Sequence, residues 1–382
     1  MNTTQAKVAQ ALREIVEQSR LAGQSVRLGV MLHGSECGEE EVLLGARQAM
    51  RQNPCLRVTV FGERQEGYPE LDWHETAPCE EECAAAIGQA IEGKGIQGAV
   101  AMHYPFPVGV TTIGKIRTPA RGRPLYIASS TGTSALSRVE ALTRNTLYGI
   151  AVAKAAGMTS PTVGLLNQDG ASGALRVLET LSAQGYAIPF GQSLRKEGGR
   201  LLRGNDLVAG SVDIAVCDTL TGNALCKVFS TFTSGGLYES AGWGYGPSVG
   251  EGWEKVISIV SRSSGAGVIA GALLHTAEMV KGNLPFHVRE ELAKAQSAGL
   301  AALLKTKHAA RPVSPGAAKL APCIVDESFG GVDVLELEAA IALLAEKGIY
   351  AEGAMGCTGP IVRVAAKDRE GAMNCLKENG YL

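Results

Sequence analysis

Near the C-terminal end of the chain, one cysteine lies in a short turn that could present a reactive thiol. The turn reads Met355-Gly356-Cys357-Thr358-Gly359-Pro360, between two strand-like runs. Glycine and proline between such runs predict a tight hairpin connection. A thiolate displayed at its tip can act as a nucleophile. The same spacing also fits an unreactive turn cysteine, so spacing alone does not decide whether the thiol of Cys357 is reactive.

Three polar, glycine-containing loops could bind an anion, because each follows a predicted strand and precedes a predicted helix. They span 129–134, 167–173 and 218–223. Backbone N–H groups at helix starts, aided by hydroxyl and amide side chains, hold phosphate or a carbonyl oxygen. The candidate phosphate- or acyl-binding residues are Ser130, Thr131, Asn167, Gly170, Asp218, Gly222, Asn223 and Lys227.

These loops also have plainer interpretations. The hydroxyl-rich run can be a polar turn that caps the next helix, and Lys227 can be a surface lysine rather than a charge for an anion. Neither a Walker nor a dinucleotide-binding motif is present. His33 and His103 lie in loops that suit a general base, but each is equally suited to a structural role.

The elements that must position these residues follow an α/β pattern. Residues 1–24 predict a helical arm, and 25–304 predict a body in which strands and helices alternate around a parallel sheet. The expected strands are 26–32, 56–61, 98–102, 124–128, 162–166 and 212–216. Because parallel sheets bind ligands beyond the carboxyl ends of their strands, we expect the three polar loops to meet there.

The rest of the body reads as a long glycine-rich loop over 235–252 and helices over 256–280 and 289–304. Residues 305–318, with two prolines, predict a linker. Residues 319–382 predict a small α+β module that carries Cys357. Its expected elements, in the order β-α-β-β-α, are a strand at 323–325, a helix at 335–347, two strands that flank Cys357 and a helix at 369–379.

The composition limits the classes of function. The net charge of the 382 residues is only −2, which gives no electrostatic case for nucleic acid or a membrane surface. No apolar run approaches the roughly 20 residues that span a bilayer. No signal peptide is visible, so a cytoplasmic location is the default expectation.

The nine cysteines are odd in number and scattered, which argues against a disulfide framework. Cys79 and Cys83 enclose three glutamates, a pattern that favours a helix start over a metal site. We therefore expect no metal and no cofactor.

The body, over about 25–285, resembles the phosphate acyltransferase of bacterial phospholipid synthesis. The resemblance rests on Gly164-Leu165-Leu166-Asn167 and on the stretch from Asp213 to Lys227. The family carries Asp-Gly-Phe-x-Gly-Asn-x-x-Leu-Lys there, whereas Thr219 and Leu220 replace Gly-Phe in this chain, which does not favour a long acyl chain. The opening loop His33-Gly34-Ser35-Glu36 also departs from the family's Met-Gly-Gly-Asp.

Body and module together are similar to the alpha subunit of component C of the glycine (sarcosine, betaine) reductase complex, over nearly the whole chain. The resemblance implies a hetero-oligomer with a beta subunit, in an anaerobic, amino-acid-fermenting cell. It implies that selenoprotein A supplies a carboxymethyl group and that the cysteine matching Cys357 carries the resulting acetyl thioester. Phosphate then takes the acetyl group as acetyl phosphate.

Two other functions remain open from the sequence. One is a free-standing phosphate acyltransferase that uses acyl-carrier or coenzyme A thioesters. The other is a non-catalytic scaffold subunit. A redox relay between Cys357 and a second thiol is a further option. We expect the linker to let the module bring Cys357 to the polar loops of the body.

Overall fold

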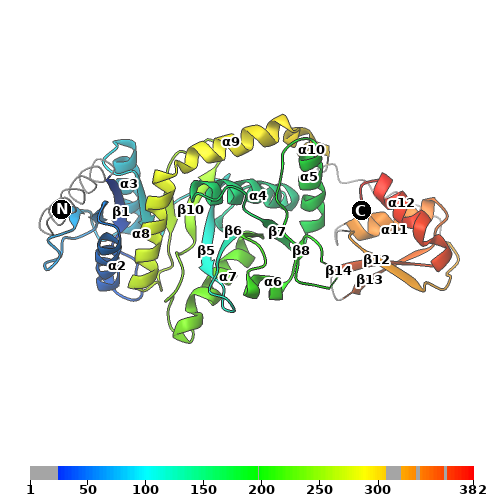
Figure 1. Cartoon of the computed structure of the whole chain (residues 1–382), viewed down its shortest axis with the longest axis horizontal. Helices are drawn as coiled ribbons and strands as arrows, with labels where there is room; N and C mark the ends of the chain where they lie inside the picture. The colour runs from blue at the N-terminus through cyan, green and yellow to red at the C-terminus, as the bar shows by residue number, and fades with distance from the viewer. Residues whose placement is uncertain (1–24, 197, 307–319, 333–335, 357–358) are drawn as a thin grey trace, which may run out of the picture.

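The computed structural model describes residues 25–196, 198–306, 320–332, 336–356 and 359–382. Cys357 lies outside these described residues, as do the predicted arm 1–24 and all but the first two residues of the predicted linker 305–318. One large sheet with its helices forms the body, and a separate three-stranded sheet forms a C-terminal module (Figure 1).

The first part of the body alternates strands and helices as predicted. Its elements are β1 (Val26–Met31), α2 (Glu39–Gln52), β2 (Leu56–Phe61), β3 (Asp72–His74), α3 (Glu80–Glu92) and β4 (Gly98–Ala101). All four strands are parallel, in the order β3-β2-β1-β4. The glutamates between Cys79 and Cys83 lie in the first turn of α3, which confirms the predicted helix start.

The second part of the body continues the sheet. Its elements are β5 (Val110–Arg117), β6 (Pro124–Gly132), α4 (Arg138–Ala155), β7 (Val163–Leu166), α5 (Ala171–Ala183), β8 (Leu201–Leu202), α6 (Gly204–Ala209), β9 (Ile214–Val216), α7 (Thr219–Thr231), β10 (Gly246–Gly250), β11 (Ile257–Ile259), α8 (Ala266–Lys281), α9 (Leu284–Ser297) and α10 (Leu300–Thr306).

The sheet of the body is parallel at both ends and antiparallel in the middle. Its order is β3-β2-β1-β4-β11-β10-β5-β6-β9-β7-β8, and only the pairings β11–β10, β10–β5 and β5–β6 are antiparallel. The predicted α/β fold with a mostly parallel sheet is confirmed. The antiparallel centre was not predicted, because β10 lies in the glycine-rich segment 235–252, and glycine is rare in strands.

Three predicted elements of the body are wrong. The run 129–134 is not a loop throughout, because β6 continues to Gly132. Ser130 is fully buried there, and its hydroxyl donates to the Tyr245 carbonyl at 2.5 Å, so a polar residue is accommodated inside the sheet. The helix predicted over 256–280 is β11 followed by α8, and the one over 289–304 is α9 and α10. A short apolar run does not distinguish a buried strand from a helix.

Two cores cover the two faces of β6. Tyr126 and Ala128 pack with α4, α5 and α9, whereas Leu125 and Ile127 pack with α6 and α7. This split follows from the alternation of side chains along a strand. A third core surrounds β1, β2 and β4 under α2, α3 and α8. Helix α8 packs on α2 and α9 on α4, so these two helices join both parts of the body (Figure 1).

The module has the predicted order β-α-β-β-α: β12 (Glu327–Gly330), α11 (Leu337–Glu346), β13 (Ala351–Gly356), β14 (Gly359–Val364) and α12 (Arg369–Glu378). Its sheet is antiparallel in the order β12-β14-β13, and the β13–β14 ladder extends to the pair Gly356–Gly359, which confirms the predicted hairpin. The strand predicted at 323–325 is wrong. Phe329 packs into the module core, whereas the Ile324 side chain is exposed, so the strand forms further along the chain.

The module contacts the body at helix α5. The Arg176 guanidinium donates through Nη1 to the Tyr381 carbonyl at 2.9 Å and through Nη2 to Glu336 Oε2 at 2.8 Å. Its side chain is only 15% exposed. The junction therefore holds two parts of the module, the start of α11 and the C-terminal segment, to one arginine of the body.

No helix among the described residues is both long and apolar enough to cross a membrane.

Candidate functional site at the carboxyl ends of the parallel strands

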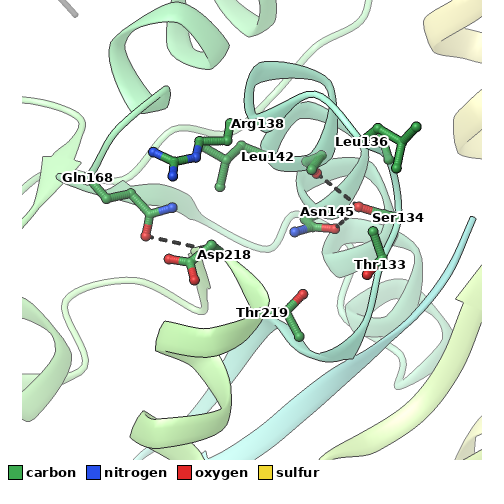
Figure 2. A pocket seen from close by; sticks show the side chains of 11 residues that line it. Thr133, Ser134, Leu136, Arg138, Leu142, Asn145, Gln168, Asp218 and Thr219 are labelled. Atoms are coloured by element: carbon green, nitrogen blue, oxygen red, sulfur yellow. Dashed lines mark hydrogen bonds between the residues drawn. The ribbon is translucent and has the colours of Figure 1, made fainter. Parts of the chain in front are cut away.

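The carboxyl ends of β6, β7 and β9 share one edge of the sheet, and helices α4, α5 and α7 begin there. Between these ends lies a cavity of about 170 Å³ (Figure 2). It is lined by Thr133, Ser134, Ala135, Leu136, Arg138, Ala141, Leu142, Asn145, Gln168, Asp218 and Thr219. Segments from each of the three predicted polar loops thus lie around one small space.

Three helices begin near this cavity: the first residues of α4 and α7, Arg138 and Thr219, line it, and Gln168 lines it from the loop that leads into α5. The N-caps are Ser137 for α4, Gly170 for α5 and Asp218 for α7. The Ser137 side chain makes no capping hydrogen bond, and Gly170 has no side chain to make one. Gly170 adopts a φ of 82°, which glycine tolerates and which turns the chain directly from the polar loop into α5. Helix N-termini carry partial positive charge and exposed N–H groups, so their convergence favours an anion.

Asp218 fixes the start of α7. Its Oδ1 accepts from the backbone N–H of Thr221 at 3.0 Å, and its Oδ2 accepts from the Thr221 hydroxyl at 2.5 Å. Its own N–H points to Gln168 Oε1 at 3.4 Å, which ties the loops after β9 and β7 together (Figure 2). Both oxygens of this carboxylate are therefore engaged in capping rather than turned to the cavity alone.

Asn145 braces the floor of the cavity from α4. The side chain is 2% exposed; its Nδ2 donates to the Cys217 carbonyl at 3.2 Å, and its Oδ1 accepts from the Ser134 hydroxyl at 2.7 Å. One amide on α4 thus contacts the chain just beyond both β6 and β9; Figure 2 shows its bond to Ser134. No sequence motif predicts this role, because Ser134 and Cys217 lie 11 and 72 residues from Asn145 in the chain.

Arg138 supplies a positive charge at the mouth of the cavity. Its Nη1 lies 2.8 Å from Asp169 Oδ2, and the two side chains are 62% and 52% exposed. An ion pair this exposed is weak, so the guanidinium can turn to an incoming anion at little cost. Neither Arg138 nor Gln168 was among the predicted site residues, although Gln168 lies within the predicted loop 167–173 and Arg138 lies four residues beyond the loop 129–134.

The predicted residues divide into lining and packing positions. Asp218 lines the cavity. A side chain at Gly222 would place its Cβ 1.7 Å from the Ser129 carbonyl, so glycine is needed to bring α7 onto β6. Asn223 Nδ2 donates to the Ser130 carbonyl at 3.1 Å, and the hydroxyls of Thr131 and Thr112 lie 2.7 Å apart. The backbone of Asn167 donates to the Leu202 carbonyl at 2.9 Å.

Lys227 does not converge with Asp218 and Asn223, which corrects the sequence-based expectation. Its Nζ donates to the hydroxyls of Ser261 at 2.5 Å and Ser263 at 2.9 Å, and forms an ion pair with Glu239 at 2.5 Å. The side chain of Glu239 is 1% exposed. Lys227 lies more than two helical turns beyond Asp218 on α7, and this spacing directs it to a different network, in which its own side chain stays 41% exposed.

Three cysteines of the body have surroundings that disfavour a thiolate. Burial, followed by the carboxylates of Glu41 and Glu36, raises the pKa of the Cys37 thiol. Burial raises the pKa of Cys217 and Cys226 strongly, and both lie in the core of the body. These three thiols are therefore mostly protonated at neutral pH.

The two histidines considered as general bases lie away from this cavity. His33 Nδ1 is 2.7 Å from Glu39 Oε1 in the loop after β1, and His103 lines a different cavity beside Tyr104 and Gly88. Neither contributes to the lining of the candidate site.

Comparisons with known proteins agree with the resemblance drawn from the sequence. The family model described as "Fatty acid synthesis protein" matches residues 26–363. The glycine/sarcosine/betaine reductase complex component C subunit alpha of Peptoclostridium acidaminophilum is 41% identical over 379 residues, which cover 98% of this chain and 97% of that protein.

Among solved structures, a branched-chain phosphotransacylase from Enterococcus faecalis aligns with a TM-score of 0.47 and 16% identity, over 67% of this chain and 99% of its own. A 4-hydroxythreonine-4-phosphate dehydrogenase homologue from Salmonella typhimurium aligns with a TM-score of 0.39 and 8% identity, over 67% of this chain and 100% of its own.

Proposed function

The chain belongs to the fatty acid synthesis protein family and to the alpha subunits of component C of the glycine/sarcosine/betaine reductase complex, and from this premise we propose that it carries an acetyl group on Cys357 and passes it to phosphate. The carboxymethyl group of selenoprotein A is the proposed source of the acetyl unit. The beta subunit of component C is the proposed partner in that step.

The observation that carries the proposal is that three helices begin near one cavity. Phosphate held there by the first amides of α4 and α7 and by Arg138 is the nucleophile. One of its oxygens attacks the carbonyl carbon of the acetyl thioester, the C–S bond breaks, and the Cys357 thiolate leaves. The same N–H groups stabilise the oxyanion of the tetrahedral intermediate. The small volume of the cavity, about 170 Å³, favours a two-carbon group over a long acyl chain.

The junction at Arg176 supports delivery of the thioester to this cavity. Arg176 lies on α5, six residues beyond the N-cap Gly170, which is about 9 Å along the helix. The module thus contacts a helix whose preceding loop lines the cavity through Gln168. In the view of Figure 1, the hairpin β13–β14 lies on the side of the module that faces the body.

The reverse reaction tests the carrier directly. The purified chain is incubated with acetyl phosphate, and peptides are mapped by mass spectrometry. We expect an acetyl group on Cys357 that hydroxylamine removes, as a thioester requires. Cys357→Ala should lose it, and Cys323→Ala, which removes an exposed thiol of the same module, should keep it. No adduct on Cys357, in a chain that folds normally, would overturn the carrier role.

The forward reaction separates the proposal from its alternatives. The chain and the beta subunit are incubated with carboxymethylated selenoprotein A, first without phosphate and then with it. An adduct on Cys357 that disappears as acetyl phosphate forms is the expected result. Full activity of the complex with Cys357→Ala would indicate a scaffold subunit. Acyl phosphate made by Cys357→Ala from a coenzyme A thioester would indicate a free-standing acyltransferase.

A further inference from the structure

A second cavity lies at the opposite end of β6 from the candidate site. Its volume is about 270 Å³, and it lies beside Pro124, the first residue of β6, and Asp213, which directly precedes β9. Four charged side chains line it: Lys115, Arg123, Asp213 and Glu278. Tyr126, Ala156 and Met158 supply an aromatic and apolar part of the wall. The cavity is therefore amphipathic and carries two charges of each sign.

The charged groups differ in how fully they are engaged. Asp213 Oδ2 accepts from both the N–H and the hydroxyl of Thr162, at 2.8 and 2.7 Å, while Oδ1 pairs with Arg123. Arg123 also donates to the Gly210 carbonyl at 3.0 Å. Both carboxylate oxygens of Asp213 are therefore engaged. The charge of Arg123 is paired, and its side chain is 42% exposed, so water can satisfy its remaining donors.

Lys115 is engaged much less completely. Its side chain is 12% exposed, yet the only acceptor among the described residues is Glu278 Oε2, at a long 3.4 Å. That oxygen also lies 2.8 Å from His275 Nδ1. The remaining neighbours of the ammonium are the rings of Trp243 and Tyr126, with centroids at 5.0 and 5.3 Å. An ammonium has three donors, and aromatic faces replace hydrogen-bond acceptors only in part.

Burial without full compensation is costly for a charged group. Burial lowers the pKa of Lys115, against the opposing effect of Glu278. An anion placed against Nζ would restore the missing acceptor. Because Glu278 and Asp213 also line the cavity, a singly charged group fits there better than a doubly charged phosphate.

From these contacts we propose that the cavity binds a small monocarboxylate, with its carboxylate on Lys115 Nζ and its short alkyl group against Tyr126, Ala156 and Met158. The ligand carboxylate supplies the close acceptor that Glu278, at 3.4 Å from the ammonium, does not. This site is separate from the candidate phosphate site, and its existence does not depend on the acetyl-transfer proposal. Since β6 connects the two cavities, an occupant here lies at the base of a strand that ends at the other site.

Calorimetric titration of the full chain with sodium propionate tests the proposal. We expect one saturable site, and binding about tenfold weaker or more for propionamide, which has the same shape without the charge. Inorganic phosphate should bind this site more weakly than propionate. Trp243 gives a second readout, because its ring lies next to the ammonium that the ligand contacts.

Two variants change the affinity in opposite directions. Lys115→Met should weaken propionate binding by about tenfold or more. Lys255→Met is the matched control, since Lys255 also pairs with a glutamate and lies over a tryptophan ring, but at a different cavity. Glu278→Gln removes the carboxylate that competes for Lys115 and should tighten propionate binding several-fold.

Each result of these titrations either supports or overturns the carboxylate site. Absence of saturable binding to the wild-type chain overturns the proposal, as does equal affinity of a folded Lys115→Met variant. If Lys115→Met fails to fold, Glu278→Gln decides: tighter binding supports the site on Lys115, and unchanged or weaker binding overturns it. Acetyl transfer to phosphate is measured separately, so failure of one proposal leaves the other untouched.

Discussion

The two ends of helix α7 use polar residues in opposite ways. At its start, Asp218 and Thr219 line a cavity, and the helix N-terminus faces open space. More than two turns later, the Lys227 ammonium pairs with the buried Glu239 and donates to two serines. One helix thus contributes residues to a candidate ligand site at its start and to a stabilising ion pair further along.

The network around Lys227 is built for stability. Glu239 is fully buried, and its carboxylate takes the Lys227 ammonium, the Tyr245 hydroxyl at 2.9 Å and the Ser264 hydroxyl at 3.2 Å. A charge so buried and so well paired is costly to disturb. The start of α7, in contrast, can lose a charge without leaving another one buried. A polar residue in the stretch from Asp213 to Lys227 therefore need not belong to the ligand site.

Lys227→Met should give the largest loss of stability, because it leaves Glu239 buried without its counter-ion. We expect about 3 kcal/mol, measured as a shift in urea unfolding. Lys255→Met, which breaks a pair whose glutamate is 66% exposed, should cost about 1 kcal/mol or less. An unchanged unfolding midpoint together with a raised KM for phosphate would place Lys227 in the phosphate site and contradict its role in stability.

Asn145→Ala should have the next largest effect. It removes the amide that joins Ser134 to the Cys217 carbonyl, and we expect a loss of about 2 kcal/mol in unfolding free energy. Because the floor of the cavity loosens, the KM for phosphate should rise as well. Asn223→Ala serves as the control: Asn223 joins a different helix, α7, to β6 through one hydrogen bond and does not line the cavity. Equal kinetic effects of both variants would contradict a bracing role for Asn145.

Asp218→Asn should change stability by only about 0.5 kcal/mol or less, since asparagine caps a helix nearly as well as aspartate. It removes a negative charge from the lining of the cavity, so phosphate should bind as well as before or more tightly. A large rise in the KM for phosphate, without unfolding, would show that the carboxylate acts on the substrate rather than on the helix.

Arg138→Gln should have the smallest effect on stability, within about 0.5 kcal/mol, because its pair with Asp169 is exposed. Its effect on phosphate should be much larger, about a tenfold rise in KM for one lost charge-assisted hydrogen bond. Arg144→Gln, which alters a partly buried arginine outside the cavity lining, is the control. A stable Arg138→Gln variant with normal phosphate kinetics would remove the arginine from the site.

Much of the architecture could be predicted from the sequence. Periodic apolar runs and helix starts located the parallel strands, α3 and the β-α-β-β-α module, because these signals are local. The parallel-sheet rule also brought together the loops that follow β6, β7 and β9. The antiparallel pair β5 and β10 could not be found, since β10 is glycine-rich and its pairing partner is more than a hundred residues away.

The site could be predicted only to the level of its loops. Asp218 followed from the motif, but whether a side chain faces the cavity or packs on β6 depends on contacts distant in sequence. Gly222 and Asn223 meet β6 through Ser129 and Ser130, and Lys227 meets the residues after β11. Asn145 had no motif to mark it. Cys357 stays a prediction, because it lies outside the described residues.

The attachment of the module at Arg176 has a kinetic consequence. Because the module and the body belong to one chain, each experiences the other at an effective concentration set by their covalent connection. This effective concentration is often in the millimolar range and does not depend on the bulk concentration of the protein. Encounters between the module and the body are therefore first order, and dilution does not slow them. Weakening the contact of Arg176 with Glu336 and Tyr381 would change how long each encounter lasts, while the supply of encounters remains fixed by the covalent chain.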